Sequence, residues 1–511
     1  MGDKNLLEKL KELSADFTDP SSPVAIILAA GQGKRIKSNY SKMLHTIWGV
    51  PTVVRVAQSA SLGLESPNQI VVVGIKALEV ASALGRAEGR LFAFQAEQKG
   101  TGHAVQVALE KAGLENAHRD YYVLPGDMGL ITAESICALK TAFKQSQAQM
   151  MVMVGTFQGD PAHNYYGRIV RVPEKDSAGF SSGDDCGKIM QIIEHRDILA
   201  LPPDKPYLLQ YRGRTYAFSR KQLLETREYN SGLYAFQGEH LFKLISQLGY
   251  NNVQGEMYLT DLIYLFNQAG LTVLGYKALQ EEELLGFNDK YVLNQMEQIA
   301  RQKVYSKLGS IVHIVDRHNF FIAEDVIAHL LELDKQGLAH DIVIREGAQL
   351  GPGVRLNEGV QIGRAARLEG NIQLGKGVYI GDAVQISCYP HQRITIGENT
   401  VILKDDVLKG NLIIGKHCQI ESPVRLTGSD EDPLIIGDHV QIKGDTYIYG
   451  SQIEDHCLII NCILHRVQIS CQRDAKGLVI PVGYIFPPPQ GKECVKPLPL
   501  RPQEAAPHKK T

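Results

Sequence analysis

The stretch LAAGQGKRIKSNYSKMLH, residues 28–45, combines two glycines with several basic side chains directly after an apolar run. Glycines such as Gly31 and Gly33 let backbone N–H groups approach phosphate oxygens closely. Arg35 can supply a planar guanidinium and Lys42 a point charge, the two kinds of cation that bind phosphates. The stretch fits a cradle for a phosphate chain, although it lacks the ending of a Walker loop and the third glycine of a dinucleotide fingerprint. A surface loop with solvated basic side chains is the alternative.

The segments around this loop alternate between short apolar runs and amphipathic stretches. Strands are predicted at residues 24–28, 70–74, 121–124 and 150–154, with helices such as 104–112 and 135–145 between them. Such alternation is typical of a mostly parallel sheet covered by helices. The predicted divisions are a helix and linker over residues 1–22, the α/β domain over 23–293 and a largely helical connector over 294–341.

The spacing of apolar residues changes to six after the connector. The first run of this pattern consists of Ile344, Leu350, Leu356, Ile362, Leu368, Leu374, Ile380 and Ile386. The pattern resumes at Ile396 and again at Ile436, each ten residues after the previous member, so four extra residues loop out at both places. A hexapeptide period is typical of a β-helix, which we predict as left-handed and parallel over residues 342–470. The Pro-rich residues 471–511 are expected to be a terminal strap or a disordered end.

Composition limits the classes of protein that this chain can represent. With 511 residues it is long enough for two or three domains, and its formal net charge of -2 gives no sign of a nucleic-acid partner. No apolar run reaches the length of about 18 residues that marks a membrane span, so we expect no membrane insertion. The eight cysteines show no CxxC spacing and are expected to be reduced thiols of a cytoplasmic protein.

Eight segments in the first 293 residues together resemble one known family. They are LAAGQGKRIKS with SKMLHTIWGVP, QAEQKGTGHAV (95–105), LPGDMGLI (124–131), YGRIVR (166–171), IIEHRD (192–197), EYNSGLYAF (228–236), GEMYLTDLI (255–263) and GFNDKYVL (286–293). In this order they resemble the nucleotidyltransferase domain of bacterial N-acetylglucosamine-1-phosphate uridylyltransferase, which is fused to a hexapeptide-repeat acetyltransferase. The resemblance implies a Rossmann-like, GT-A-like α/β domain followed by a left-handed parallel β-helix. Hexapeptide β-helices are commonly trimeric, so we expect a homotrimer by analogy.

The resemblance also implies roles for individual residues. Nucleotide binding is assigned to Leu28, Ala29, Ala30, Gly31, Gly33, Gln95, Gly100, Thr101 and Gly126. The implied catalytic cations are Arg35 and Lys42, and the implied Mg²⁺ ligands are Asp127 and Asn288. Two oxygen donors completed by phosphate oxygens and water suit Mg²⁺, which rarely takes a full protein cage. For Asp127, an ordinary turn carboxylate at a strand end is the alternative.

The implied sugar site consists of Gly167, Glu194 and Asn230. Glu194 would accept hydrogen bonds from sugar hydroxyls, and Asn230 would bind the N-acetyl and hydroxyl region. The alternatives are a surface ion pair between Glu194 and Arg196 and a turn asparagine at Asn230. His103 starts a predicted helix, where we expect it to pack or cap the helix instead of transferring protons.

The implied reaction joins UTP and a sugar 1-phosphate, N-acetylglucosamine 1-phosphate in this family, and releases pyrophosphate. The attacking phosphate is already an anion, so no general base is needed, and catalysis rests on positioning and on stabilisation of charge. Another hexose 1-phosphate is an alternative substrate. A non-catalytic subunit that binds sugar nucleotides is a further alternative, but the retained cations and metal ligands argue against it.

Two stretches depart from the family. About thirty residues, 198–228, separate the Glu194 and Asn230 segments, and they are expected to form a flap over the sugar pocket. The β-helix lacks the Lys-Ala-x-His-Leu-x-Tyr-x-Gly-Asp and Asn-Tyr-Asp-Gly stretches on which acetyl transfer relies, so we predict that acetylation of glucosamine 1-phosphate is absent. A bifunctional enzyme with a rebuilt acetyl site is the alternative. The histidines of the repeats are expected to be solvated coil residues, namely His391, His417 and His439.

Overall fold

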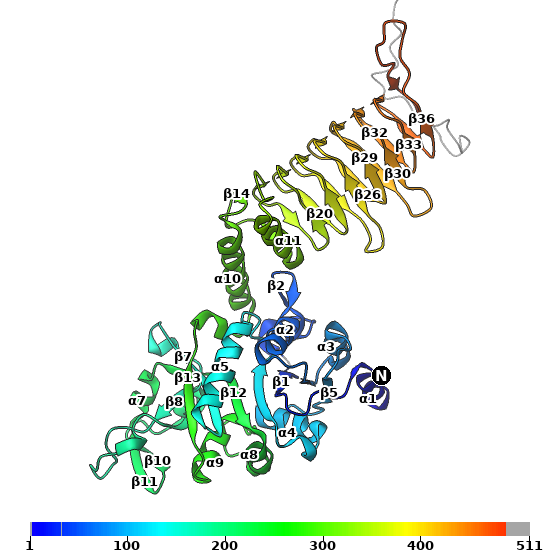
Figure 1. Ribbon diagram of the computed structural model, residues 1–511. Coiled ribbons are helices and arrows are strands. Elements are labelled where there is room, and N and C mark those ends of the chain that lie inside the picture. The colour runs from blue at the N-terminus through cyan, green and yellow to red at the C-terminus, as the bar shows by residue number, and fades with distance from the viewer. Residues whose placement is uncertain (1–2, 32, 487–511) are drawn as a thin grey trace, which may run out of the picture. The chain divides into compact units, whose positions relative to one another are not determined.

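The computed structural model describes residues 3–31 and 33–486, and the chain divides into two compact units, residues 1–300 and 301–511. The first unit is built on a central sheet with the strand order β13-β7-β12-β6-β1-β4-β5 (Figure 1). These strands are β1 (Val24–Ala29), β4 (Gln69–Val73), β5 (Arg90–Phe94), β6 (Asp120–Pro125), β7 (Met150–Thr156), β12 (Glu228–Gln237) and β13 (Val273–Lys277). Strands β1, β4, β5 and β6 are parallel, whereas β12 runs antiparallel between β6 and β7.

Helices cover both faces of this sheet, which explains why its strands are continuously apolar. Alternate side chains of β1 enter different cores: Val24 and Ile26 lie in one, and Ala25 and Ile27 lie in the other. The first core is closed by α4 (Thr101–Ala112), α8 (Gly238–Leu244) and α9 (Leu262–Gln268). The second is closed by α2 (Thr52–Leu64), α3 (Ala77–Leu84) and α5 (Ala133–Ser146). Leu10 of α1 (Asp3–Leu13) is buried in the second core, so the N-terminal helix is part of the domain.

Strand register determines which loops meet at the sheet edge. Because β1 and β6 are parallel and Leu28 pairs with Pro125, the loops after both strands begin at the same edge. The first loop carries the short helices η1 (Lys34–Ile36) and η2 (Lys42–Leu44) and then the small hairpin of β2 (Thr46–Ile47) and β3 (Val50–Pro51). Ligands of open α/β sheets bind outside the carboxyl ends of the strands.

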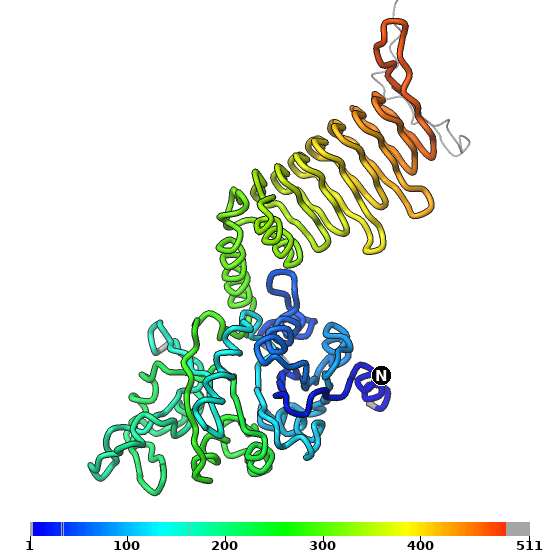
Figure 2. Tube along the Cα trace, viewed as in Figure 1, coloured from blue at the N-terminus to red at the C-terminus, as the bar shows by residue number. Residues whose placement is uncertain are grey.

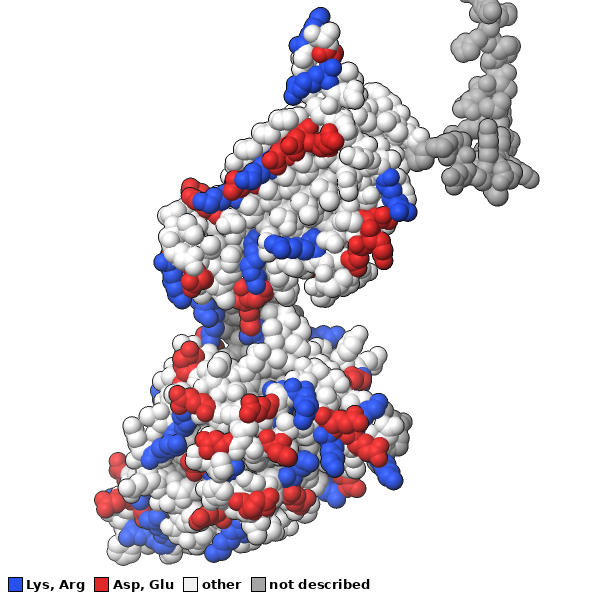
Figure 3. Space-filling model, turned by 45° about the vertical axis from the view of Figure 1, so that its right-hand side comes forward, with Lys and Arg blue, Asp and Glu red and all other residues white. Residues whose placement is uncertain are grey.

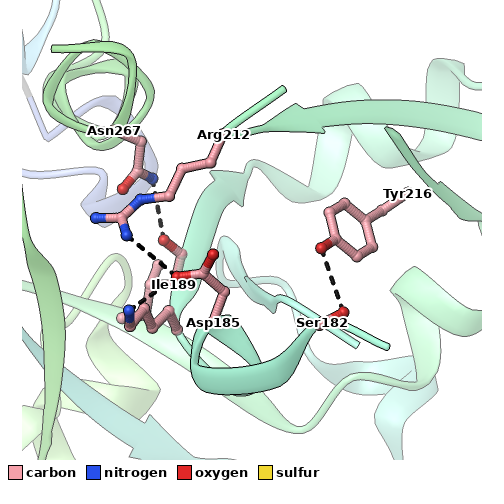
Figure 4. Close-up of polar contacts among 7 residues, drawn as sticks. Ser182, Asp185, Ile189, Arg212, Tyr216 and Asn267 are labelled. Carbon is pink, nitrogen blue, oxygen red and sulfur yellow. Dashed lines mark hydrogen bonds and ion pairs between the residues drawn. The ribbon is translucent and has the colours of Figure 1, made fainter. Parts of the chain in front are cut away.

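The insertion over residues 198–228 forms an antiparallel hairpin, β10 (Tyr207–Tyr211) and β11 (Arg214–Phe218), followed by α7 (Arg220–Glu225). It packs against β8 (Arg168–Arg171) and β9 (Ile189–Ile193), with α6 (His195–Ala200) alongside, around a small core of its own. Polar contacts fasten it, as Figure 4 shows: Arg212 donates to Asp185 Oδ1 at 3.2 Å, and the hydroxyls of Tyr216 and Ser182 lie 3.2 Å apart. Asn267 of α9 secures β9 by donating to the carbonyl oxygen of Ile189 at 3.0 Å.

The second unit is a left-handed parallel β-helix whose coils follow one another in Figure 2. Three long parallel sheets run along it, and Ile344, Ile362 and Ile380 pair in one of them, so three hexads make one coil. The hexad residues predicted as its core are fully or almost fully buried. Acidic and basic side chains alternate along the outside (Figure 3), with pairs such as Lys376–Glu358 at 3.1 Å and Lys416–Glu398 at 3.2 Å.

The coil structure begins before the predicted start of the repeats. Strands β14 (His313–Ile314) and β15 (Phe321–Ile322) already pair with β16 (Val343–Ile344) and β17 (Gln349–Leu350). The expected connector is helical only in α10 (Lys290–Leu308) and α11 (Glu324–Lys335), because these two strands interrupt it. At the other end, β37 (Val482–Gly483) pairs with β34 (Leu458–Ile460). The expected strap or disordered end falls largely on residues 487–511, outside the described residues. Within the described chain, no helix is long and apolar enough to cross a membrane.

Candidate active site

A pocket of about 610 Å³ opens at the carboxyl ends of β1 and β6. Eight residues predicted for nucleotide and sugar binding line it, namely Leu28, Ala30, Gly31, Gln95, Gly100, Thr101, Glu194 and Asn230. Six of them belong to the predicted nucleotide set and two to the predicted sugar set. The pocket therefore brings both predicted sites together in one cavity.

The pocket wall formed by Gln95, Gly100 and Thr101 of the predicted nucleotide set depends on close backbone packing. Gln95 is buried, and its Nε2 donates to the carbonyl oxygen of Gly100 at 3.2 Å and lies 3.0 Å from His103 Nδ1. Gly100 has φ +111, and a Cβ there would lie 2.4 Å from the carbonyl oxygen of Met257, so only glycine fits. Thr101 Oγ1 accepts a hydrogen bond from the Leu259 amide at 3.1 Å. His103 thus packs against the amide of Gln95, in line with its expected structural role.

The predicted metal ligands converge on Lys42. Its Nζ lies 2.5 Å from Asp127 Oδ2 and donates to Asn288 Oδ1 at 3.0 Å. The same nitrogen lies 5.3 Å from the ring centroid of Phe287, a distance that allows a cation–π contact. A carboxylate oxygen and an amide oxygen therefore face a common positive charge. This donor set and its arrangement fit a hard divalent cation such as Mg²⁺, with phosphate oxygens and water as further ligands.

Glycines hold the loops of this cluster close together. Gly33 has φ +60, and a Cβ there would lie 2.8 Å from Lys42 Cβ, so the loop backbone rests directly on the lysine stem. A Cβ on Gly126 would lie 3.0 Å from the carbonyl oxygen of Leu28 and 3.1 Å from the sulfur of Met43. One on Gly286 would lie 3.2 Å from Asp127 Oδ1. A side chain at Gly33 would press on the Lys42 stem, and one at Gly286 would press on the Asp127 carboxylate.

Some predicted residues do not line the pocket. Arg35 is exposed on η1, and Ala29 is buried in the sheet core. The neighbouring cluster consists of Gly33, Lys42, Gly126, Asp127 and Asn288. It adjoins the pocket, because Met43 and Pro125, which line the pocket, follow Lys42 and precede Gly126 directly in the sequence. Gly167 lies behind Glu194, because a Cβ there would be 2.9 Å from Glu194 Oε1.

The sugar end is shaped by an irregularity in β12. The register of β12 shifts between Asn230 and Tyr234, and such bulges turn a side chain out of the regular ladder. Asn230 Oδ1 accepts from the Gly232 amide and from the Tyr234 hydroxyl, both at 2.9 Å. These bonds fix the orientation of the amide, so its nitrogen is the group that can donate to a ligand. The turn role and the binding role of Asn230 are therefore compatible.

Glu194 sits in an unusual electrostatic environment. Burial, together with the nearby carboxylates of Asp197 and Asp261, raises its pKa to about 7, although the charge of Arg168 acts in the opposite direction. Arg168 is fully buried and donates to the backbone carbonyl oxygens of Tyr166 and Asn164. The ion pair between Glu194 and Arg196 does not form, since Arg196 donates to Gln254 at 2.9 Å.

Several lining residues were not predicted. They are Met43, Gln98, Ala104, Pro125, Gly232, Tyr234, Glu256, Tyr258, Leu259 and Thr260. Glu256, Tyr258, Leu259 and Thr260 belong to GEMYLTDLI, a segment matched to the family without a role for any residue. The family match of this segment was the one indication that it belongs to the site. Its local sequence does not indicate that it lies beside the carboxyl ends of the sheet strands.

The described residues of the insertion do not line this pocket, so the flap over the sugar stays a prediction. Its hairpin is held instead against β8 and β9 by its own core. It contributes Leu201 and Tyr207 to a neighbouring pocket of about 590 Å³, which shares Glu194 and Tyr258 with the first.

The sheet and the pocket suit a nucleotidyltransferase, and comparison with known proteins shows that class. Residues 25–214 match the family described as MobA-like NTP transferase domain. Bifunctional protein GlmU from Halalkalibacterium halodurans is 31% identical over 397 residues, 77% of this chain and 76% of that protein. The same protein from Exiguobacterium sp. strain AT1b is 36% identical over 59% of this chain and 58% of its own length. The match to the solved UDP-glucose pyrophosphorylase in complex with UDP-glucose covers 55% of this chain and 99% of that chain at 13% identity, with a TM-score of 0.38.

The chain belongs to the family of bifunctional protein GlmU. It is accordingly a sugar-1-phosphate nucleotidyltransferase.

Proposed function

We propose that the first unit forms UDP-N-acetylglucosamine and pyrophosphate from UTP and N-acetylglucosamine 1-phosphate. The observation that carries this proposal is the single pocket shared by the two residue sets, beside the cluster of Lys42, Asp127 and Asn288. A pocket that holds both substrates at once suits direct transfer between them.

In the proposed reaction, a phosphate oxygen of the sugar 1-phosphate attacks the α-phosphorus of UTP in line with the leaving pyrophosphate. A bond between that oxygen and the α-phosphorus forms as the bond from the α-phosphorus to the bridging oxygen breaks. The backbone of the Gly31–Gly33 loop and the cations Arg35 and Lys42 bind the phosphates and stabilise the growing charge. Glu194 and the amide nitrogen of Asn230 hold the sugar so that its phosphate points at the nucleotide.

We propose Mg²⁺ as the metal, held by Asp127 and Asn288. When bound, it would neutralise phosphate charge shared between the nucleotide and the sugar phosphate. Removal of divalent ions with a chelator is expected to stop turnover, and added Mg²⁺ is expected to restore it.

The direct test is pyrophosphate release from UTP with a panel of sugar 1-phosphates, using the full chain with Mg²⁺. The proposal expects the highest kcat/KM with N-acetylglucosamine 1-phosphate. A preference for another hexose would correct the substrate, and release with none of them would defeat the enzymatic proposal.

We further propose that the β-helix assembles the chain into a homotrimer in the cytoplasm. Stacked coils present long flat faces that favour self-association. The seven cysteines in the described residues are all free thiols, as expected in a reducing compartment. Sedimentation equilibrium of the full chain tests the assembly, and a monomeric mass would contradict it.

A further inference from the structure

Lys42 occupies the position between the two oxygen atoms proposed to hold the metal. Its ammonium nitrogen is 2.5 Å from Asp127 Oδ2 and 3.0 Å from Asn288 Oδ1. The side chains of Lys42 and Asp127 are only 10% and 14% exposed, so water screens the pair weakly. The protein itself therefore supplies a cation to this oxygen pair.

An ammonium group and a divalent ion compete for the same two oxygen atoms. Two cations at one oxygen pair repel each other strongly in a site shielded from water. A divalent ion therefore binds more favourably once the ammonium group has moved away. In the arrangement seen here, the lysine competes with the metal.

The stem of Lys42 packs against the backbone of Gly33, beyond which its flexible chain carries the ammonium group. The backbone at Gly33 rests on Cβ of Lys42, and a Cβ on Gly33 would lie 2.8 Å away from it. The loop that carries Gly31 and Gly33 is also the loop proposed to bind the triphosphate. Phosphate oxygens in that loop would offer the ammonium group anionic partners within reach of its flexible four-carbon chain.

We propose that Lys42 is the resident cation of Asp127 and Asn288 in the nucleotide-free protein, and that a bound triphosphate draws its ammonium group away so that the divalent ion enters with the nucleotide. This inference rests on the proposed function, because it takes the triphosphate as the ligand of the glycine loop. It assigns Lys42 two successive sets of partners, first the two protein oxygens and then the phosphates. A consequence is that the free protein holds divalent ions poorly even though both donors are in place.

The test measures Mn²⁺ binding to the full-length protein without nucleotide, using the electron paramagnetic resonance signal of free Mn²⁺. The unmodified protein is expected to bind Mn²⁺ at this site no more tightly than about 1 mM, a weak affinity for oxygen-donor sites. The variant Lys42→Met removes the charge and keeps much of the stem. It is expected to bind Mn²⁺ at least about tenfold more tightly, a usual size of coupling between two binding events. Adding Asp127→Asn to that variant is expected to abolish the gain.

Lys37→Met is the matched control, because it removes a positive charge from the same loop at an exposed position. An equal gain in Lys37→Met and Lys42→Met would show a general charge effect and overturn the inference. Micromolar Mn²⁺ binding by the unmodified protein would overturn it without any variant, so misfolding of Lys42→Met does not remove the test. The two proposals fail in different experiments. Failure of the proposed function appears as an absence of pyrophosphate release, whereas Mn²⁺ binding is measured without nucleotide and without turnover.

Discussion

Lys42 Nζ lies 2.5 Å from Asp127 Oδ2, although one residue follows β1 and the other follows β6. The parallel pairing of these strands places both loops at one edge, and Asn288 joins them from a third segment. The phosphate loop and the metal ligands therefore form one unit.

Asp127→Asn keeps the size of the side chain and removes its charge. We expect kcat to fall by at least about 100-fold, the scale seen when one group that stabilises transition-state charge is lost. Turnover is measured as pyrophosphate release at saturating substrates and Mg²⁺. An unchanged melting temperature serves as the control for folding, and near-normal turnover would remove Asp127 from the metal site.

Arg35→Ala tests a catalytic role for an exposed residue. We expect kcat to fall by about 100-fold or more while UTP affinity changes little, because the guanidinium is proposed to act on charge that grows during transfer. Isothermal titration with UTP and steady-state kinetics separate the two effects. Lys37→Ala is the control from the same loop. A loss confined to UTP affinity would make Arg35 a binding residue only.

Gly33→Ala tests the contact between the loop and the lysine stem. The left-handed backbone at Gly33 costs an alanine about 1–2 kcal/mol, and its Cβ would also lie 2.8 Å from Lys42 Cβ. We expect a lower melting temperature and a kcat/KM reduced by about tenfold or more, since strain of this size displaces the lysine.

Gly31→Ala is the matched control for that prediction. A Cβ on Gly31 meets nothing within 4 Å, and its backbone does not adopt positive φ. We expect no fall in its melting temperature. Equal destabilisation of both variants would contradict the role given to the contact between Gly33 and Lys42.

The raised pKa of Glu194, about 7, predicts a pH dependence of sugar binding. A carboxylate with a raised pKa is neutral below that value, so its ability to accept hydrogen bonds from the sugar is present above pH 7 and is lost as the pH falls through 7. The measurement is KM for N-acetylglucosamine 1-phosphate across this range. We expect KM to rise on the acid side.

Glu194→Gln separates this effect from titration of the substrate, whose phosphate loses its second proton near pH 6, about the value of other phosphate monoesters. The variant is expected to have a higher KM at pH 8 and to lose the inflection near pH 7. If the variant retains the inflection, the ionisation belongs to another group.

The β-helix is predicted not to acetylate glucosamine 1-phosphate. His391 is exposed and paired with Asp430 at 2.9 Å, while His417 and His439 are exposed and stacked with ring centroids 5.0 Å apart. Acetyl-CoA consumption with glucosamine 1-phosphate is expected to equal the rate without enzyme. Acetylation that disappears in His391→Ala would show that a rebuilt site exists.

The sequence by itself determined the elements that repeat or carry strong local patterns. The six-residue period predicted the core of the β-helix because every coil buries the same positions, and the apolar runs predicted β1, β4, β6 and β7 because both faces of the sheet are covered. The ordered segments contain every described residue that lines the pocket, but a role was predicted for only eight of them.

Only the tertiary structure decided how distant groups meet. Lys42 faces Asp127 and Asn288 because strand pairing brings three separate segments together, and no local pattern encodes that meeting. The insertion lies on β8 and β9 because its apolar side chains pack with theirs in a small core. The six-residue period did not predict the first strands of the β-helix, because α11 separates them from the next coil in the sequence. In each case the deciding free energy comes from contacts between residues far apart in the chain.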